Sequence, residues 1–156
     1  MPLVPFAVTG RGTGVAQTVT VDGADYTIET DAYEAFGGQD QHPSPLAFTL
    51  ASLSSCNQVT SSIVARELGV TIEHVSFRVE ADFNPTTMTT GAHREGETTF
   101  QNLRVTAEVA TDATTEQFET LRTETERRCP VSQLFVLAGV KVTTTWTQFQ
   151  TATASA

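Results

Sequence analysis

Alternating apolar and polar positions predict three β-strands in the second half of this chain. Residues 75–83 alternate strictly between apolar and polar side chains, which is typical of a half-buried strand. Residues 103–109 repeat the pattern, and a last strand is expected over residues 140–149. Near the N-terminus, two β-prone runs flank Asp22-Gly23, a dipeptide that favours a tight hairpin turn.

Apolar residues at helical spacing predict a long helix from Ser44 to about Leu68. Ser44 can cap this helix, Pro45 suits its first position, and Gly69 suits the position just past its end. Cys56 falls on or beside the apolar stripe and has small neighbours. We therefore expect a close helix–helix contact around this thiol.

A second helix is expected over residues 112–128, with Thr114 in a possible capping box. Pro130 should end it at Cys129, because the residue before a proline disfavours helical backbone angles. A short third helix should then occupy residues 131–137.

The order of these elements predicts an α+β fold with antiparallel sheets packed on two main helices. One domain is expected over residues 1–150, with a polar loop at 84–98 and a flexible C-terminal tail at 151–156.

The net charge and the hydropathy of the chain argue against some classes of binding partner and cellular location. Nine basic and eighteen acidic residues give a net charge of −9, which argues against nucleic acid and anionic membranes. No charged-then-apolar leader opens the chain, and no apolar run approaches about 18 residues. We expect a soluble, cytoplasmic protein.

The two cysteines, Cys56 and Cys129, are compatible with a structural disulfide, two inert buried thiols, or a redox pair. A redox thiol acts as its thiolate, and burial opposes thiolate formation. Cys56 lies about three turns into its helix, too far for the helix N-terminus to help. A cation is therefore required, and Arg11, Arg127 and Arg128 are the candidates. Alternatively, the last two complement a helix C-terminus and Arg11 is a solvated turn residue.

Two segments resemble those of the OsmC/Ohr family of thiol-dependent hydroperoxide peroxidases. They are GGQDQHPSPLAFTLASLSSC, which ends at Cys56, and RCPV, which contains Cys129. The likeness extends in order over nearly the whole chain. It implies that Cys56 is the peroxidatic cysteine, Cys129 the resolving cysteine, and Arg11 the thiolate-stabilising arginine.

The same resemblance implies an OsmC-like fold and an intertwined homodimer with residues of both chains at each site. It also implies an apolar pocket for organic hydroperoxides, an external dithiol reductant, and neither metal nor flavin. The chain departs from the family pattern at one place. Peroxidases of this type carry an arginine-orienting acid just after the helix-start proline or one residue later, where Leu46 and Ala47 stand here.

The histidines do not predict a metal site. His42, His74 and His93 lack ligand spacing with one another or with the cysteines. His42 stands where many relatives have glycine, and it fits an exposed residue before the helix. The glycine-rich run at residues 10–14 has no P-loop lysine.

The leading hypothesis is therefore a thiol peroxidase that reduces organic hydroperoxides through Cys56 and Cys129. The alternative is a non-catalytic relative that binds a small apolar ligand or senses oxidants. A stable fold with two inert thiols is the third possibility.

Overall fold

The computed structural model describes residues 2–92 and 99–150, and the chain divides into two compact units, Met1–Thr49 and Leu50–Ala156. Each unit is described by itself. The single domain expected over residues 1–150 stays a prediction. His93 and the expected tail lie outside the described residues.

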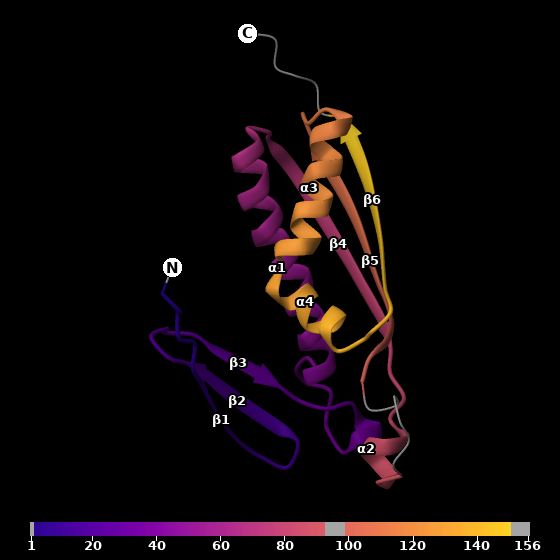
Figure 1. The fold of residues 1–156 in the computed structure, drawn as a ribbon. Helices are drawn as coiled ribbons and strands as arrows, with labels where there is room; N and C mark the ends of the chain where they lie inside the picture. The colour runs from indigo at the N-terminus through magenta and orange to yellow at the C-terminus, as the bar shows by residue number, and fades with distance from the viewer. Residues whose placement is uncertain (1, 93–98, 151–156) are drawn as a thin grey trace. The chain divides into compact units, whose positions relative to one another are not determined.

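The first unit contains a three-stranded antiparallel sheet, β1 (Val8–Thr13), β2 (Ala16–Val21) and β3 (Thr27–Thr30), in that spatial order (Figure 1). Strands β2 and β3 confirm the predicted hairpin, and Gly23 adopts the positive φ of 79° that its turn requires. Strand β1 was not expected, and a tight turn at Gly14 joins it to β2.

A buried aspartate organises the connection that follows β3. The carboxylate of Asp31 accepts hydrogen bonds from the backbone N–H groups of Ala32, Gln39 and Gln41, at 2.7, 3.0 and 3.2 Å. These bonds fold the loop, which includes the short 3₁₀ helix η1 (Glu34–Phe36), around one side chain. They also lower the pKa of Asp31.

The long helix α1 (Pro45–Leu68) begins and ends as its sequence predicts. The hydroxyl of Ser44 accepts the N–H of Ala47 at 3.2 Å, and Gly69 closes the helix with φ 67°. Part of α1 lies in each unit. Its buried face in the second unit consists of Leu53, Asn57, Thr60, Ser61, Val64 and Ala65.

The second unit contains a mixed sheet, β4 (Ile72–Asp82), β5 (Gln101–Thr111) and β6 (Val142–Gln150), with β5 in the centre. Strand β4 is antiparallel to β5, but β6 is parallel to it. The expectation of antiparallel sheets is therefore correct for β4 and β5 and wrong for β6. Ala107 of β5 lies opposite both Phe77 and Trp146, whose rings meet edge to face.

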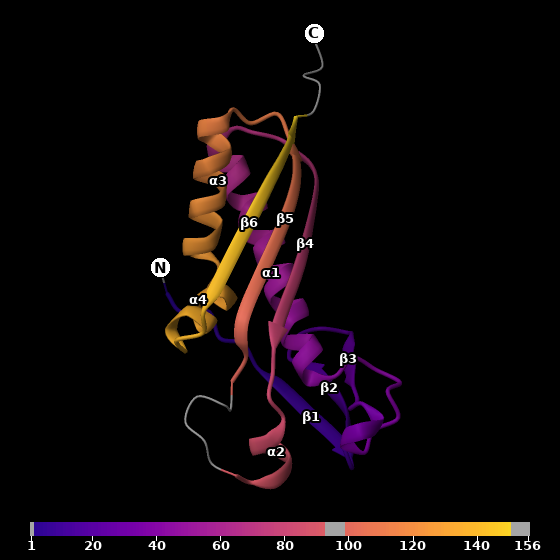
Figure 2. The ribbon, with the colours of Figure 1, turned by 90° about the vertical axis from the view of Figure 1, so that its right-hand side faces the viewer.

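Helices α3 (Thr115–Arg128) and α4 (Pro130–Leu137) lie with α1 on one face of this sheet (Figure 2). The capping box at Thr114 is present, so α3 starts three residues later than expected. Cys129 has extended backbone angles and separates α3 from α4, as the following proline predicts.

The expected polar loop at residues 84–98 is partly helical. Helix α2 (Thr86–Thr90) occupies five residues of it and ends at Gly91, which has φ 71°. Residues 93–98 lie outside the described residues.

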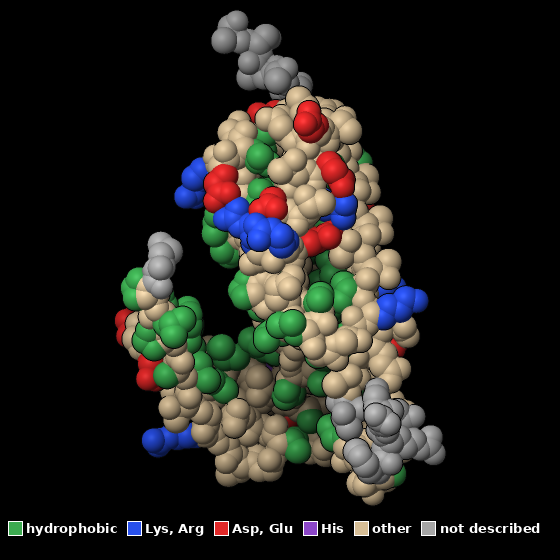
Figure 3. All heavy atoms as spheres, viewed as in Figure 1, with side chains coloured by type: hydrophobic (Ala, Val, Ile, Leu, Met, Phe, Trp, Pro, Cys, Tyr) green, Lys and Arg blue, Asp and Glu red, His purple; other side chains and the backbone are tan. Residues whose placement is uncertain are grey.

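The core of the second unit lies between the sheet and the three helices. Its fully buried apolar side chains include Leu53, Val64, Leu103, Ala107, Val109 and Leu121. Figure 3 shows charged side chains over α3 and hydrophobic side chains over α4. The described helices include none with the length and apolarity to cross a bilayer.

Candidate functional site

The two cysteines are positioned by different elements of the second unit. Cys56 is half-buried in the middle of α1. Cys129 is fully buried and is the N-cap residue of α4, where its Sγ accepts the N–H of Ser132 at 3.4 Å. The break that Pro130 forces between α3 and α4 is what places a thiol at the start of a helix.

The fold brings these two thiols into contact, although 73 positions separate them in sequence. Cys56 packs against the apolar cluster that contains Cys129, the two side chains influence each other's ionisation, and both thiols are free. They share one apolar cluster, whose buried members besides Cys129 are Leu53, Leu103, Val105 and Phe135.

Burial raises the pKa of the Cys56 thiol above its ordinary value, and this is the largest influence on it. A hydrogen bond from the backbone N–H of Val131 lowers that pKa, and the contact with Cys129 raises it further. The hydroxyl of Thr60 acts in the same direction as Val131. Cys56 therefore favours its protonated form, and the Val131 N–H and the Thr60 hydroxyl partly offset this effect.

Polar contacts fasten α1 to the helices that carry Cys129. The hydroxyl of Ser132 donates to Oδ1 of Asn57 at 3.2 Å, directly beside Cys56 in sequence. Arg128 of α3 forms a two-point ion pair with Glu67 of α1, with an Nη2–Oε1 distance of 2.9 Å. Both contacts hold the thiol-bearing segments together.

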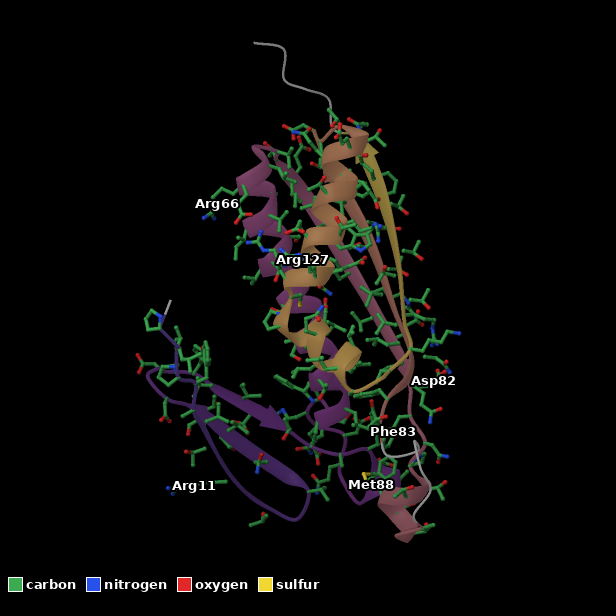
Figure 4. The ribbon with its side chains drawn as sticks, in the orientation of Figure 1. Arg11, Arg66, Asp82, Phe83, Met88 and Arg127 are labelled. Carbon is green, nitrogen blue, oxygen red and sulfur yellow. The ribbon has the colours of Figure 1, made fainter. Side chains whose placement is uncertain are left out.

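Both arginines beside Cys129 are engaged by carboxylates. Arg127, on the exposed side of α3 (Figure 4), contacts Glu124 at 2.7 Å, and Arg128 contacts Glu67. This arrangement is expected if the two arginines stabilise the helices through ion pairs and do not stabilise a thiolate.

Arg11 lies in β1 of the first unit, exposed, with its side chain projecting outward (Figure 4). It borders a polar cavity of about 460 Å³ within that unit, together with Thr18 and Glu29. These three residues are register neighbours across β1, β2 and β3, and the hydroxyl of Thr18 donates to Glu29 at 2.6 Å. Proximity of Arg11 to the thiols stays a prediction.

The first turn of α1 contains no acidic residue, in keeping with Leu46 and Ala47. His42 is exposed at the edge of the cavity in the first unit, and His74 is exposed on β4. Within residues 2–92 and 99–150, no group of three or more histidine, cysteine or acidic side chains could hold a metal ion.

A cavity of about 360 Å³ lies beside the thiols in the second unit. Leu53, one helical turn before Cys56, and Asn57, directly after it, form part of the wall, as do Ser132 and Gln133 in the first turn of α4. The rest of the wall comes from β5, β6, α3 and α4. Apolar side chains such as Leu103 and Trp146 line one part of it, and α3 adds the charged Glu126 and Arg127. The cavity adjoins the cysteines without being lined by either sulfur.

Sequence reasoning missed three polar side chains around the thiols, namely Asn57, Thr60 and Ser132. Thr60 follows Cys56 by one helical turn, a spacing that places both on one face and could have identified it. The pairing of Asn57 with Ser132 had no sequence signal, because it depends on how α4 packs against α1.

Solved structures with the same fold match nearly the full length of the chain. The OsmC-like protein from Mycoplasma pneumoniae has a TM-score of 0.78 at 16% identity, covering 93% of this chain and 97% of that one. An organic hydroperoxide resistance protein from Elizabethkingia anophelis has a TM-score of 0.73 at 17% identity, covering 95% and 99%. The organic hydroperoxide resistance protein OhrB of Bacillus subtilis has a TM-score of 0.61 at 21% identity, covering 94% and 100%.

No curated protein sequence matches this chain. The family described as OsmC-like protein matches residues 38–145, which include both cysteines and most of the second unit. With this sequence match and the shared α+β architecture, the chain belongs to the OsmC-like protein family.

Proposed function

We propose that the protein is a thiol peroxidase that reduces organic hydroperoxides through Cys56 and Cys129. The observation that carries the proposal is the contact between one half-exposed thiol and one fully buried thiol. The accessible Cys56 sulfur can react with a hydroperoxide, and the buried Cys129 sulfur can then react with the sulfenic acid formed on Cys56. Structural relatives named as organic hydroperoxide resistance proteins add support.

In the first step, the Cys56 thiolate attacks the distal oxygen of the hydroperoxide. The O–O bond breaks, the alkoxide takes up a proton to leave as an alcohol, and Cys56 becomes a sulfenic acid. In the second step, the sulfur of Cys129 attacks the Cys56 sulfur, and the sulfenic oxygen leaves as water. An external dithiol then reduces the resulting disulfide and is itself oxidised to a disulfide.

The site favours hydroperoxides with an apolar substituent. The cavity beside the thiols has an apolar part formed by Leu53, Leu103, Val105 and Trp146, which an alkyl or aryl group can contact. Hydrogen peroxide has no such group, so we expect it to be a poorer substrate. Arg11 remains the proposed cation for the thiolate.

The assembly we propose is a homodimer. Helix α1 leaves Val59 and Ile63 exposed, and α4 leaves Leu134, Val136 and Leu137 exposed. Apolar side chains concentrated on two helices around the thiols are typical of a surface that a second subunit covers.

The alternative, a slow oxidant sensor or small-ligand binder, is favoured by one observation. Burial raises the pKa of Cys56, and the first turn of α1 lacks the acid that orients the arginine in peroxidases of this type. A scarce thiolate reacts slowly. Such a protein would still form the disulfide, but too slowly to remove substrate.

The deciding experiment measures the second-order rate constant of the reduced protein with cumene hydroperoxide near neutral pH. We expect a value well above that of a free low-molecular-weight thiol, and above the protein's own value with hydrogen peroxide. Cys56→Ser should abolish the reaction, whereas Cys129→Ser should permit one turnover and stop at the sulfenic acid. A rate no higher than that of the free thiol would retire the peroxidase proposal in favour of the sensor.

A further inference from the structure

We propose that Thr60 is a catalytic residue whose hydroxyl holds the Cys56 thiolate, with the first turn of α4 completing a hydrogen-bond cradle around that sulfur. The proposal deepens the peroxidase mechanism and rests on it for its catalytic meaning. It supplies, within the second unit, the thiolate stabilisation that the sequence suggested only a cation could provide.

The hydroxyl of Thr60 is used differently from those of other helical threonines in this protein. Threonine in a helix commonly donates to the carbonyl oxygen one turn earlier. The threonines that do so here are Thr49, Thr89, Thr90, Thr120 and Thr123. Thr60 lies one turn after Cys56 on the same face of α1, and its hydroxyl lowers the pKa of that thiol. Its side chain is 7% exposed, so little water competes for the hydroxyl.

The first turn of α4 contributes consecutive backbone donors to the two sulfurs. The N–H of Ser132 donates to Cys129 at 3.4 Å, and the N–H of the preceding residue, Val131, lowers the pKa of Cys56. Pro130, at the first position of the helix, has no N–H to offer. The positive end of α4 therefore faces both sulfurs, an arrangement that favours a thiolate.

A side-chain contact keeps this turn in place. The bond from the Ser132 hydroxyl to Asn57 joins α4 to the residue that follows Cys56, and Asn57 is itself buried. The cradle therefore has a fixed geometry before substrate arrives, which is the condition under which hydrogen bonds stabilise a developing charge best.

Charged side chains nearby largely neutralise one another. Glu67 is paired with Arg128, and Glu124 with Arg127. The titratable group in contact with Cys56 is Cys129, which is fully buried. Within the second unit, neutral donors are therefore left to favour the thiolate over the thiol.

The test uses Thr60→Val, which removes the hydroxyl and preserves the shape of the side chain. The reduced protein is alkylated with iodoacetamide across a range of pH, and peptide mass spectrometry follows modification of Cys56. We expect the apparent pKa of Cys56 to rise by about one unit, which means about tenfold less thiolate at any pH below it. Thr60→Ser, which keeps the hydroxyl, should restore the original value.

Thr125→Val is the matched control. Thr125 is likewise a buried threonine on a helix of the same unit, and its hydroxyl has no hydrogen-bond partner among the described residues. This variant should leave the apparent pKa of Cys56 unchanged. If Thr60→Val does not fold, Thr60→Ala carries the same expectation.

The peroxide reaction gives a second, weaker readout. A thiolate of higher pKa is scarcer but intrinsically more nucleophilic, so a tenfold loss of thiolate should slow the reaction only about threefold. An unchanged alkylation pKa in Thr60→Val, or an equal shift in Thr125→Val, overturns the role of Thr60. Because alkylation needs no peroxide, that outcome is independent of whether the protein is a peroxidase.

Discussion

Ser132 and Asn57 are joined by a hydrogen bond of 3.2 Å between the serine hydroxyl and the amide oxygen Oδ1. Asn57 lies in α1 immediately after Cys56, and Ser132 lies in the first turn of α4, three residues after Cys129. One contact therefore links the helices that bear the two thiols, close to both of them.

Removal of this contact should destabilise the protein. Ser132→Ala leaves the buried Oδ1 of Asn57 without its donor, which costs about 1–3 kcal/mol in the free energy of unfolding. Chemical denaturation measures the loss. Ser62→Ala is the control, because the Ser62 hydroxyl is exposed and bonds only within its own helix. Equal effects of the two substitutions would contradict the role given to the contact.

Mild oxidation should join Cys56 to Cys129 within one chain. Their side chains are already in contact while reduced, so a disulfide needs little movement of α1 or α4. Mass spectrometry after one equivalent of cumene hydroperoxide should show the loss of two hydrogens and a peptide that links the two cysteines. Persistent free thiols, or sulfinic acid at Cys56 as the sole product, would exclude the pair.

Replacement of Arg11 tests whether this arginine or the hydrogen-bond donors around Cys56 stabilise the thiolate. If Arg11 reaches the thiolate in the assembled protein, Arg11→Ala should raise the apparent pKa of Cys56, since it removes a stabilising charge. Arg11→Lys should keep most of the charge and therefore most of the effect. Alkylation rates across pH measure both variants, and an unchanged pKa in Arg11→Ala would leave the donors of the second unit as the stabilising groups.

The ion pair between Glu67 and Arg128 should make stability depend on pH. The hydrogen bond from Arg128 lowers the pKa of Glu67 in the folded protein, so the pair stabilises the fold above the carboxyl's unfolded pKa. That contribution is lost as the pH falls through the folded pKa. Glu67→Gln should therefore destabilise the protein at neutral pH and approach the parent in acid.

A double-mutant cycle with Arg128→Gln tests that assignment. Once either partner is gone, loss of the other should cost little more at neutral pH. Thermal unfolding across pH provides the measurements, and strictly additive losses would show that the two side chains act independently.

Elements governed by local rules could be predicted from the sequence. Helix α1 has a serine cap, a proline at its first position and a glycine after its end, and all three act as expected. Pro130 likewise places Cys129 between two helices. Strands β4 and β5 follow from alternation, because one face of each contacts the core.

The missed elements lack those signals. Every residue of β1 is exposed, and two glycines interrupt it, so it shows no apolar alternation. Helix α2 consists of threonines and one methionine within a polar run. Helix α3 starts late because Asp112 accepts the N–H of Thr71 at 2.7 Å, which leaves Thr114 to cap the helix.

The cradle around Cys56 could not be predicted for a different reason. Its Thr60 component follows from helical spacing, but the donor from Val131 depends on the packing of α4 against α1. Alternation also gives no strand direction, so the parallel pairing of β6 with β5 was not foreseen.

That parallel pairing has a consequence for how a newly made chain acquires its reactive centre. Parallel strands need a long connection between them, and Cys129 lies inside the one that joins β5 to β6. The cluster around Cys129 includes Val142 at the start of β6, so its surroundings are complete only after the last strand has docked. Long-range pairing of this kind forms slowly. We therefore expect the environment of the Cys56–Cys129 pair to become complete only after β6 has been synthesised and has paired with β5.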